Sequence, residues 1–273
     1  MKKKILATLI LVSILAITLS GCLGGNNQKT ITVKGSTTVL PIASSCAEEF
    51  NQQQKNLSVS VTGGGSSVGI KSVATKAADI GMASRQVTQE EIDEYGDNFN
   101  DHIVAYDGIA VIVSENIYQV GVTDLTLQEV KKIYTGEISN WQELGGADQE
   151  IFVVTREEGS GTRAVFYETL GIDSSNADQA SSGNARVRQA VQGSDSGIGF
   201  IGLGYLGEGV KAISLNGVSP TEKNVKSGEY PIKRSLHLYT WGETSITEQT
   251  FLDFVLSDEG QQIVEENGFI PAN

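Results

Sequence analysis

The sequence predicts an α/β fold in which short strands and amphipathic helices alternate along most of the chain. Two patterns support this prediction. Apolar runs with a period of two alternate with segments whose apolar residues recur every three or four positions. In addition, three of the strand-like runs end in a turn of small residues that leads directly into a helical segment. Such strand–turn–helix units are typical of layered α/β folds.

The first part of the chain begins with a predicted strand and a helix over Val39–Phe50, where apolar residues recur at helical spacing. Thr88 and Glu91 match a helix capping box, which predicts a polar helix after Thr88. Val68–Ala77 is predicted as a helix, and the strands are Thr30–Lys34, Leu57–Val61, Ala78–Met82 and Ile109–Val113.

The second part continues the alternation. Further capping boxes, Thr126 with Glu129 and Ser245 with Glu248, predict two more helical regions, and the last of these stops near Gly268. Thr162–Leu170 is also predicted as a helix, and the strands are Ile151–Thr155, Ile198–Ile201, Ala212–Leu215 and Leu236–Tyr239.

The composition excludes some classes of function. The 273 residues include 20 basic and 33 acidic side chains, for a net charge of −13. Because such a chain lacks the basic surface that duplex nucleic acid requires, we expect no nucleic-acid partner. Two histidines and two cysteines offer little material for a metal site, and we expect no metal or cofactor. Cys46 falls on the apolar face of a predicted helix and is expected to be buried and inert.

The N-terminus resembles the leader of a secreted lipoprotein. Lys2–Lys4 precede the apolar stretch Ile5–Leu19, which is too short for an ordinary membrane span, and small residues then precede Cys22. We therefore expect a signal peptide over 1–21, lipidation of Cys22 and a polar tether over 22–29. Lipid chains at Cys22 would hold the protein at the outer face of the cell membrane.

The three small-residue turns have the features of anion-binding sites. They are Val33–Thr38, Thr62–Ser67 and Arg156–Thr162. Each places unpaired backbone N–H groups and hydroxyls at a helix N-terminus, where the helix dipole also favours negative charge. Since Ser and Thr cap many helices, one such turn is weak evidence, but three in one chain favour a small oxyanion ligand.

Two enzymatic interpretations fit less well. Gly64–Ser72 resembles the phosphate loop of NTPases, but Lys71 comes one residue late, which turns its side chain by about 100°. Glu158–Thr162 lacks the flanking glycines of a serine-hydrolase elbow. His102 and His237 lie in strand-like segments, where a structural role is expected.

Taken in order, the motifs resemble one family, the periplasmic phosphate-binding proteins (PstS) of ABC-type phosphate importers. The similarity extends over nearly all of the chain after the leader. The motifs are Gly35–Thr38, Gly63–Ser67, Asp79–Arg85, Asp107–Val111, Ile133–Trp141, Arg156–Thr162 and Gly260–Pro271.

The resemblance implies a two-lobe periplasmic-binding-protein fold of type II, with hinge strands between the lobes and the anion in the cleft. Lobe 1 would comprise 30–110 and the return segment 236–273, and lobe 2 would comprise 111–235. The implied protein is a monomer that binds phosphate, delivers it to an ABC-type permease and catalyses no reaction.

The resemblance also implies a set of phosphate-binding residues. Arg156 would supply a bidentate guanidinium, with Glu158 as the acidic residue that restrains it. The remaining contacts would come from hydroxyls and backbone N–H groups. The implied set is Thr37, Thr38, Ser66, Ser84, Arg156, Ser160, Gly161 and Thr162, and to it we add Asp107 as a candidate of our own.

One position departs from the family pattern. Some members carry an Asp after the third motif that accepts the proton of phosphate, but here Ser84 is followed by Arg85. Asp107 is our substitute for that acceptor, and the alternative is that it only braces the hinge. Arg85 would point either at the anion or at Glu90.

Other functions remain open at this point. The same fold would suit sulfate, molybdate or tungstate, depending on whether an acceptor carboxylate faces the anion. A surface phosphatase would need a metal cluster or an activated nucleophile, and neither spacing is present in the sequence. A sensor or adhesin lipoprotein without a transporter is a third alternative.

Overall fold

The computed structural model describes residues 28–273. The predicted signal peptide, the lipidation at Cys22 and most of the predicted tether lie outside the described residues. Within 28–273, no helix combines the length and the apolar character that a membrane crossing requires.

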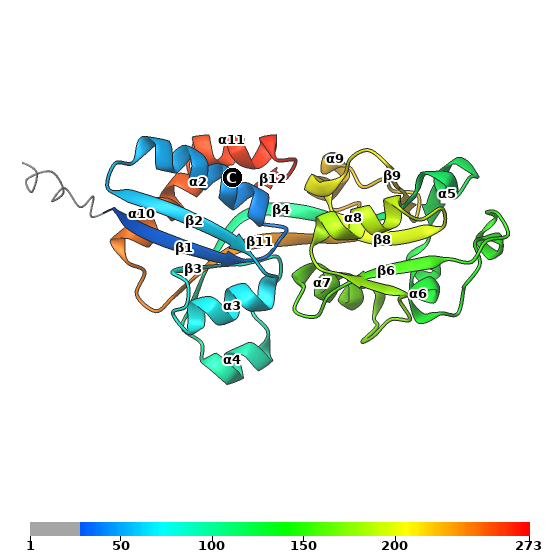
Figure 1. The fold of residues 1–273 in the computed structure, drawn as a ribbon, viewed down its shortest axis with the longest axis horizontal. Helices are drawn as coiled ribbons and strands as arrows, with labels where there is room; N and C mark the ends of the chain where they lie inside the picture. The colour runs from blue at the N-terminus through cyan, green and yellow to red at the C-terminus, as the bar shows by residue number, and fades with distance from the viewer. Residues whose placement is uncertain (1–27) are drawn as a thin grey trace, which may run out of the picture.

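A mixed sheet of ten strands runs through both halves of the molecule, in the order β2-β1-β3-β11-β4-β8-β6-β7, with β9 and β12 also paired to β4. Strand β4 (Phe99–Ser114) joins the two halves (Figure 1). Its first part pairs with β11 (Lys233–Trp241), and its second part pairs with β8 (Gly197–Gly202) and β9 (Val210–Ala212).

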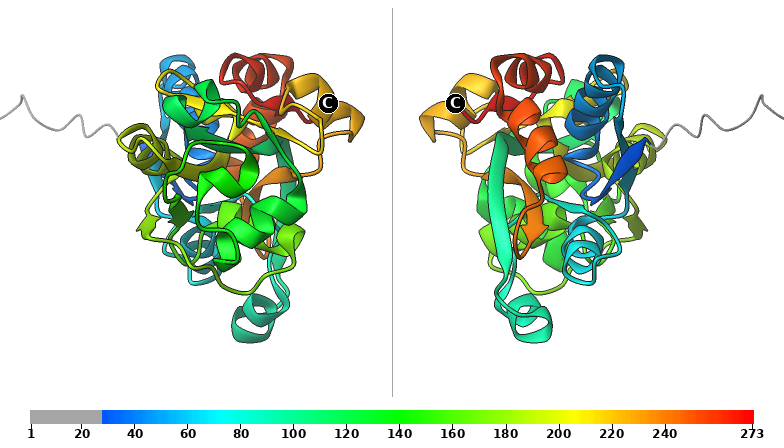
Figure 2. Two further views of the ribbon diagram at one scale, coloured as in Figure 1. Left: turned by 90° about the vertical axis from the view of Figure 1, so that its right-hand side faces the viewer. Right: turned by 90° about the vertical axis from the view of Figure 1, so that its left-hand side faces the viewer.

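The first half contains three parallel strands, β1 (Lys29–Gly35), β2 (Leu57–Gly63) and β3 (Ile80–Ala83). Figure 2 shows α2 and α11 on one side of this sheet and α4 on the other. Phe50 of α2 packs edge-on against Phe251 of α10, with ring centroids 5.4 Å apart. The helices and the last strand of this half are α2 (Leu40–Gln53), α3 (Ser66–Ala74), α4 (Gln89–Tyr95), α10 (Ile246–Leu256), α11 (Asp258–Glu266) and β12 (Ile270–Pro271).

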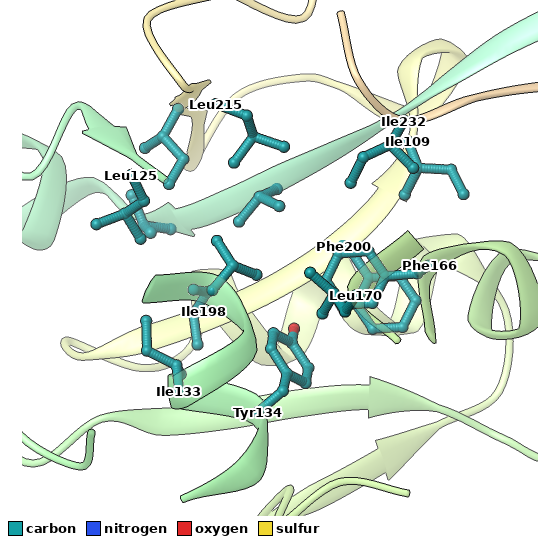
Figure 3. Close-up of a cluster of buried hydrophobic side chains, with 14 of the residues drawn as sticks. Ile109, Leu125, Ile133, Tyr134, Phe166, Leu170, Ile198, Phe200, Leu215 and Ile232 are labelled. Carbon is teal, nitrogen blue, oxygen red and sulfur yellow. The ribbon is translucent and has the colours of Figure 1, made fainter. Parts of the chain in front are cut away.

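The second half has a separate hydrophobic core of aliphatic side chains that also contains several aromatic rings (Figure 3). Phe166 stacks on Phe200 at 3.9 Å between centroids, and the Tyr134 hydroxyl donates to the Val154 carbonyl (3.1 Å). The elements not yet named are α5 (Glu115–Gln119), β5 (Asp124–Leu125), α6 (Leu127–Thr135), η1 (Trp141–Leu144), β6 (Phe152–Arg156), α7 (Gly161–Leu170), β7 (Gln179–Ser181), α8 (Asn184–Gln192), η2 (Leu203–Tyr205), β10 (Ser214–Leu215) and α9 (Glu222–Ser227).

The α/β prediction is confirmed, and so are the capping boxes that begin α4, α6 and α10. Three local predictions need correction. The strand predicted over Ile109–Val113 is the buried end of the longer β4. The last helical region is two helices, because Ser257 adopts an extended backbone and caps α11. Helix α8 was not predicted, since Val187 and Val191 are its only buried apolar residues and two residues do not mark a helical period.

Cys46 is buried, as predicted, and burial raises the pKa of its thiol to about 12. The predicted lobe boundaries at 110/111 and 235/236 remain predictions. At both positions a strand, β4 or β11, continues without a break.

Candidate functional site

The N-termini of helices from both halves meet at one place. The Ser67 N–H at the start of α3 donates to the Gly159 carbonyl before α7 (3.1 Å), which links the two halves. Gly183, which precedes α8, lies so close to the turn before α2 that a Cβ on it would be 3.6 Å from Thr37 Cγ2. The first N–H groups of each helix have no partner within the helix. The region therefore concentrates free donors and the positive ends of helix dipoles.

Two serines from the first half contact the start of α7. The Ser84 N–H donates to Ser66 Oγ (3.0 Å), and the two hydroxyl oxygens are 3.3 Å apart. Gly161 faces them closely, because a Cβ there would be 2.7 Å from Ser84 Oγ and nearer still to Ser66 Oγ. Ser160 is buried and caps α7 by accepting the Arg163 N–H (3.3 Å).

Arg156 ends β6 and is almost fully buried, with 1% of its surface exposed. Its Nε and Nη2 atoms donate to the two carboxylate oxygens of Glu157 at 2.8 and 2.9 Å. The other edge of the guanidinium faces Thr37 Oγ1 (3.2 Å from Nη2) and Asn184 Oδ1 (3.3 Å from Nη1). One edge is thus held by a carboxylate, and the opposite edge lies among polar groups of the turns.

The partner of Arg156 is Glu157, and not Glu158 as the resemblance implied. Glu158 is exposed on the turn, whereas Glu157 also accepts the Gly183 N–H (3.2 Å). Burial acts to raise the pKa of Glu157, but the hydrogen bonds and the charge of Arg156 outweigh it. The pKa therefore lies below its ordinary value of 4.5, and the carboxylate remains ionised.

Thr38 and Thr162 come from opposite halves, and their hydroxyl oxygens are 3.2 Å apart. Asn184 Nδ2 donates to Thr38 Oγ1 (3.0 Å). Arg234 donates to both hydroxyls, from Nη1 to Thr162 Oγ1 (2.8 Å) and from Nη2 to Thr38 Oγ1 (3.3 Å). All of these side chains are buried. The two threonines therefore sit in front of a second guanidinium.

Asp107 forms a buried ion pair with this second arginine. Arg234 Nε and Nη2 donate to Asp107 Oδ2 at 3.1 and 2.7 Å, and the Leu203 N–H donates to Oδ1 at 3.0 Å. Burial raises the pKa of Asp107, while the charge and hydrogen bonds of Arg234 act against the rise. Of the two roles considered for Asp107, this geometry favours the bracing one.

Arg85 points to Glu91 and to Ser67 of the second turn, and not to Glu90. It donates to both carboxylate oxygens of Glu91 at 2.7 Å, and to Ser67 Oγ at 2.9 Å. Burial acts to raise the pKa of Glu91, but the Arg85 and Thr88 hydrogen bonds outweigh it and lower the pKa below 4.5. Arg85 thus fastens α4 to the start of α3.

The site as a whole suits an oxyanion. Its two buried arginines are balanced by Glu157 and Asp107, and its remaining polar groups are chiefly hydroxyls and N–H donors. Donors fixed in a buried region bind an anion without the cost of reorganising water. No three His, Cys, Asp or Glu residues are grouped as metal ligands within residues 28–273.

Three polar residues of this region were not predicted. They are Arg234, Asn184 and Tyr205, whose hydroxyl donates to the Thr37 carbonyl (2.5 Å). Arg234 offered one signal, since it is a charged residue two positions before the predicted strand Leu236–Tyr239. Asn184 and Tyr205 lie in polar or glycine-rich segments without a distinctive motif.

His237 lies in a chain of side chains that superficially resembles a catalytic triad. Its Nε2 is 2.8 Å from Ser235 Oγ, and its Nδ1 is 2.6 Å from Asp101 Oδ1. However, Ser235 and His237 lie within β11, paired along β4, and not at the start of a helix with free N–H donors. We interpret this chain as a brace between β11 and β4, in line with the structural role expected for His237.

Comparisons with known proteins identify the family of the chain. Residues 23–259 match the model of the PBP superfamily domain. The chain is 37% identical to the phosphate-binding protein PstS of Bacillus subtilis, over 88% of this chain and 80% of that protein. It is 32% identical to PstS of Borreliella burgdorferi, over 99% of each chain.

Solved structures give the same result. A putative phosphate ABC transporter substrate-binding protein from Clostridium perfringens, solved with bound phosphate, has a TM-score of 0.84 and 38% identity. The match covers 90% of this chain and 100% of that one. An ABC-type phosphate transport receptor from Vibrio cholerae has a TM-score of 0.74 and 32% identity, over 88% of this chain and 99% of that one. The chain therefore belongs to the PBP superfamily and, within it, to the family of the PstS proteins.

Proposed function

We propose that this protein captures inorganic phosphate between its two halves and delivers it to the permease of an ABC-type importer. The observation that carries the proposal is the likeness of almost the whole chain to the C. perfringens protein with bound phosphate. The buried donors described above supply the chemistry, because phosphate offers several acceptor oxygens to a site that is rich in donors.

The residues proposed to contact phosphate come from all three turns and from the end of β3. Arg156 would bind through its Nη1–Nη2 edge, since Glu157 occupies the other edge. Hydroxyls and helix N-terminal N–H groups would surround the remaining oxygens. The set is Thr37, Thr38, Ser66, Ser84, Arg156, Ser160, Gly161 and Thr162. Asp107 belongs to the site through its ion pair with Arg234.

Capture would involve closure of two lobes, which we place at 30–110 with 236–273 and at 111–235. Strands β4 and β11 would form the hinge, because they connect the halves. The contacts between the halves, such as Thr38 to Thr162, would form as the lobes close. The ligand would leave unchanged, with no catalytic step.

The proposed setting is the outer face of the cell membrane. A lipid on Cys22 would anchor a monomer there, close to the permease. The motif that supports this anchor lies before residue 28, within the segment Lys2–Cys22.

Calorimetric titration tests the ligand. Protein expressed from the full chain, purified and freed of ligand, is titrated with phosphate and then with sulfate and molybdate. We expect phosphate to bind with a Kd of about 1 μM or lower, about −8 kcal/mol. Binding of sulfate or molybdate without binding of phosphate would refute phosphate as the ligand, while the assignment of the fold would stand. The absence of a binding signal with all three anions would also refute the proposal.

A further inference from the structure

Arg234 is a buried cation for which the sequence suggested no role. It lies directly opposite Asp107 where β11 pairs with β4, and 7% of its surface is exposed. Asp107 receives its Nε and one Nη2 hydrogen, so the rest of the guanidinium is free to point elsewhere. Its Nη1 atom and the second hydrogen of Nη2 donate to Thr162 and Thr38, which come from opposite halves of the molecule.

These contacts restrict what the two hydroxyls can do. A threonine oxygen has two lone pairs and one O–H group. Thr38 Oγ1 accepts from both Asn184 and Arg234, so only its proton is left to offer. Thr162 Oγ1 accepts from Arg234 at 2.8 Å and has the Thr38 hydroxyl 3.2 Å away as a further donor. The Thr38 proton is therefore directed at Thr162, and the pair presents one O–H donor, that of Thr162, and no acceptor.

We propose that Arg234 is a positioning residue of the anion site, which makes Thr38 and Thr162 donate only and so selects an unprotonated oxygen at this end of the cleft. This inference rests on the proposed function. The phosphate monoanion carries two O–H groups and the dianion carries one. The monoanion is therefore more often forced to place an O–H group at this end of the cleft, where no acceptor is available. The site should therefore prefer the dianion of phosphate to its monoanion.

The neighbours of Arg234 fix its charge and direction. Asp107 holds it from β4, and the charge of Arg156 also acts on it. Lysine could not replace it, because a single ammonium lacks the planar fork that reaches the aspartate and both threonines at once.

The test compares Arg234→Lys with the unaltered protein, both expressed from the full chain. Phosphate affinity is measured by calorimetry at pH values below and above the second ionisation of phosphate. We expect Arg234→Lys to weaken binding by roughly tenfold to a hundredfold at the higher pH, the range for losing one charged hydrogen bond. The loss should be smaller at the lower pH, because a freed hydroxyl oxygen can then accept a hydrogen bond from the protonated anion.

Lys233→Ala is the matched control, because it removes a positive charge at the next position of β11 from an exposed side chain. It should change the affinity less than twofold at both pH values. Circular dichroism and thermal melting without ligand check the fold. If Arg234→Lys does not fold, Asp107→Asn replaces it, since the isosteric amide loosens the guanidinium and should flatten the pH profile in the same way.

These measurements distinguish a failure of the proposed function from a failure of the proposed role of Arg234. No phosphate binding by the unaltered protein refutes the proposed function. Binding by the unaltered protein together with an equal affinity of Arg234→Lys refutes the role of Arg234. An equal loss of affinity at both pH values would also overturn the inference, because it would leave Arg234 a purely structural role.

Discussion

Gly161→Ala tests whether the anion lies between the start of α7 and the two serines of the first half. An added Cβ would be 2.7 Å from Ser84 Oγ and closer to Ser66 Oγ, so α7 or the two serine hydroxyls would have to shift until these contacts reach an ordinary 3.4 Å. The helix itself should tolerate alanine, because Gly161 is the first residue of α7 and alanine is a better helix former than glycine. The expected damage is therefore to binding and not to folding.

The expected loss of phosphate affinity follows from the hydrogen bonds that this shift breaks. Losing one hydrogen bond to a charged ligand costs about 1.5–3 kcal/mol, which is roughly a tenfold to hundredfold rise in Kd. Calorimetric titration with phosphate measures this change, and thermal melting without ligand should show little difference from the unaltered protein.

Gly193→Ala is a matched control, because Gly193 follows α8 at the end opposite to the site and a Cβ there meets its nearest atom at 3.2 Å. It should bind phosphate as the unaltered protein does. An unchanged Kd for Gly161→Ala would refute the reasoning, since it would show that the anion does not occupy this contact.

Three further predictions concern single side chains. Glu157→Gln should weaken phosphate binding about tenfold or more, because it removes the carboxylate that holds the buried Arg156. Glu158→Gln should leave calorimetric titrations with phosphate unchanged. Equal effects of the two substitutions would contradict Glu157 as the partner of Arg156. Glu91 has a folded-state pKa below 4.5, so its contribution to stability is present above pH 4.5 and is lost as the pH falls through the lower value. Urea unfolding should therefore show a gap in the free energy of unfolding between the unaltered protein and Glu91→Gln that narrows in acid, and a constant gap would argue against the ion pair. Cys46 should resist thiol reagents in the native protein and react on unfolding, because burial raises its pKa to about 12; fast native labelling would disprove its burial.

Much of the fold could be predicted because its signals are local. A capping box such as Thr88 with Glu91 satisfies N–H groups within one turn of helix, so the sequence around it is sufficient. The same holds for the small-residue turns, each of which creates free donors at the start of its own helix. The paired carboxylate was harder to predict, because Glu157 and Glu158 are neighbours and only the backbone path after β6 decides which one turns inward.

The sequence by itself determined the α/β class, the anion-binding chemistry of the three turns and the family resemblance. Only the tertiary structure decided that these turns meet, since their contact depends on strand order and on the way β4 connects the halves. It likewise decided that Arg234 faces Asp107, because that pair is created by the register of two strands far apart in the sequence. Propensities and caps act over a few residues, whereas register and ion pairing follow from the packing of the whole chain.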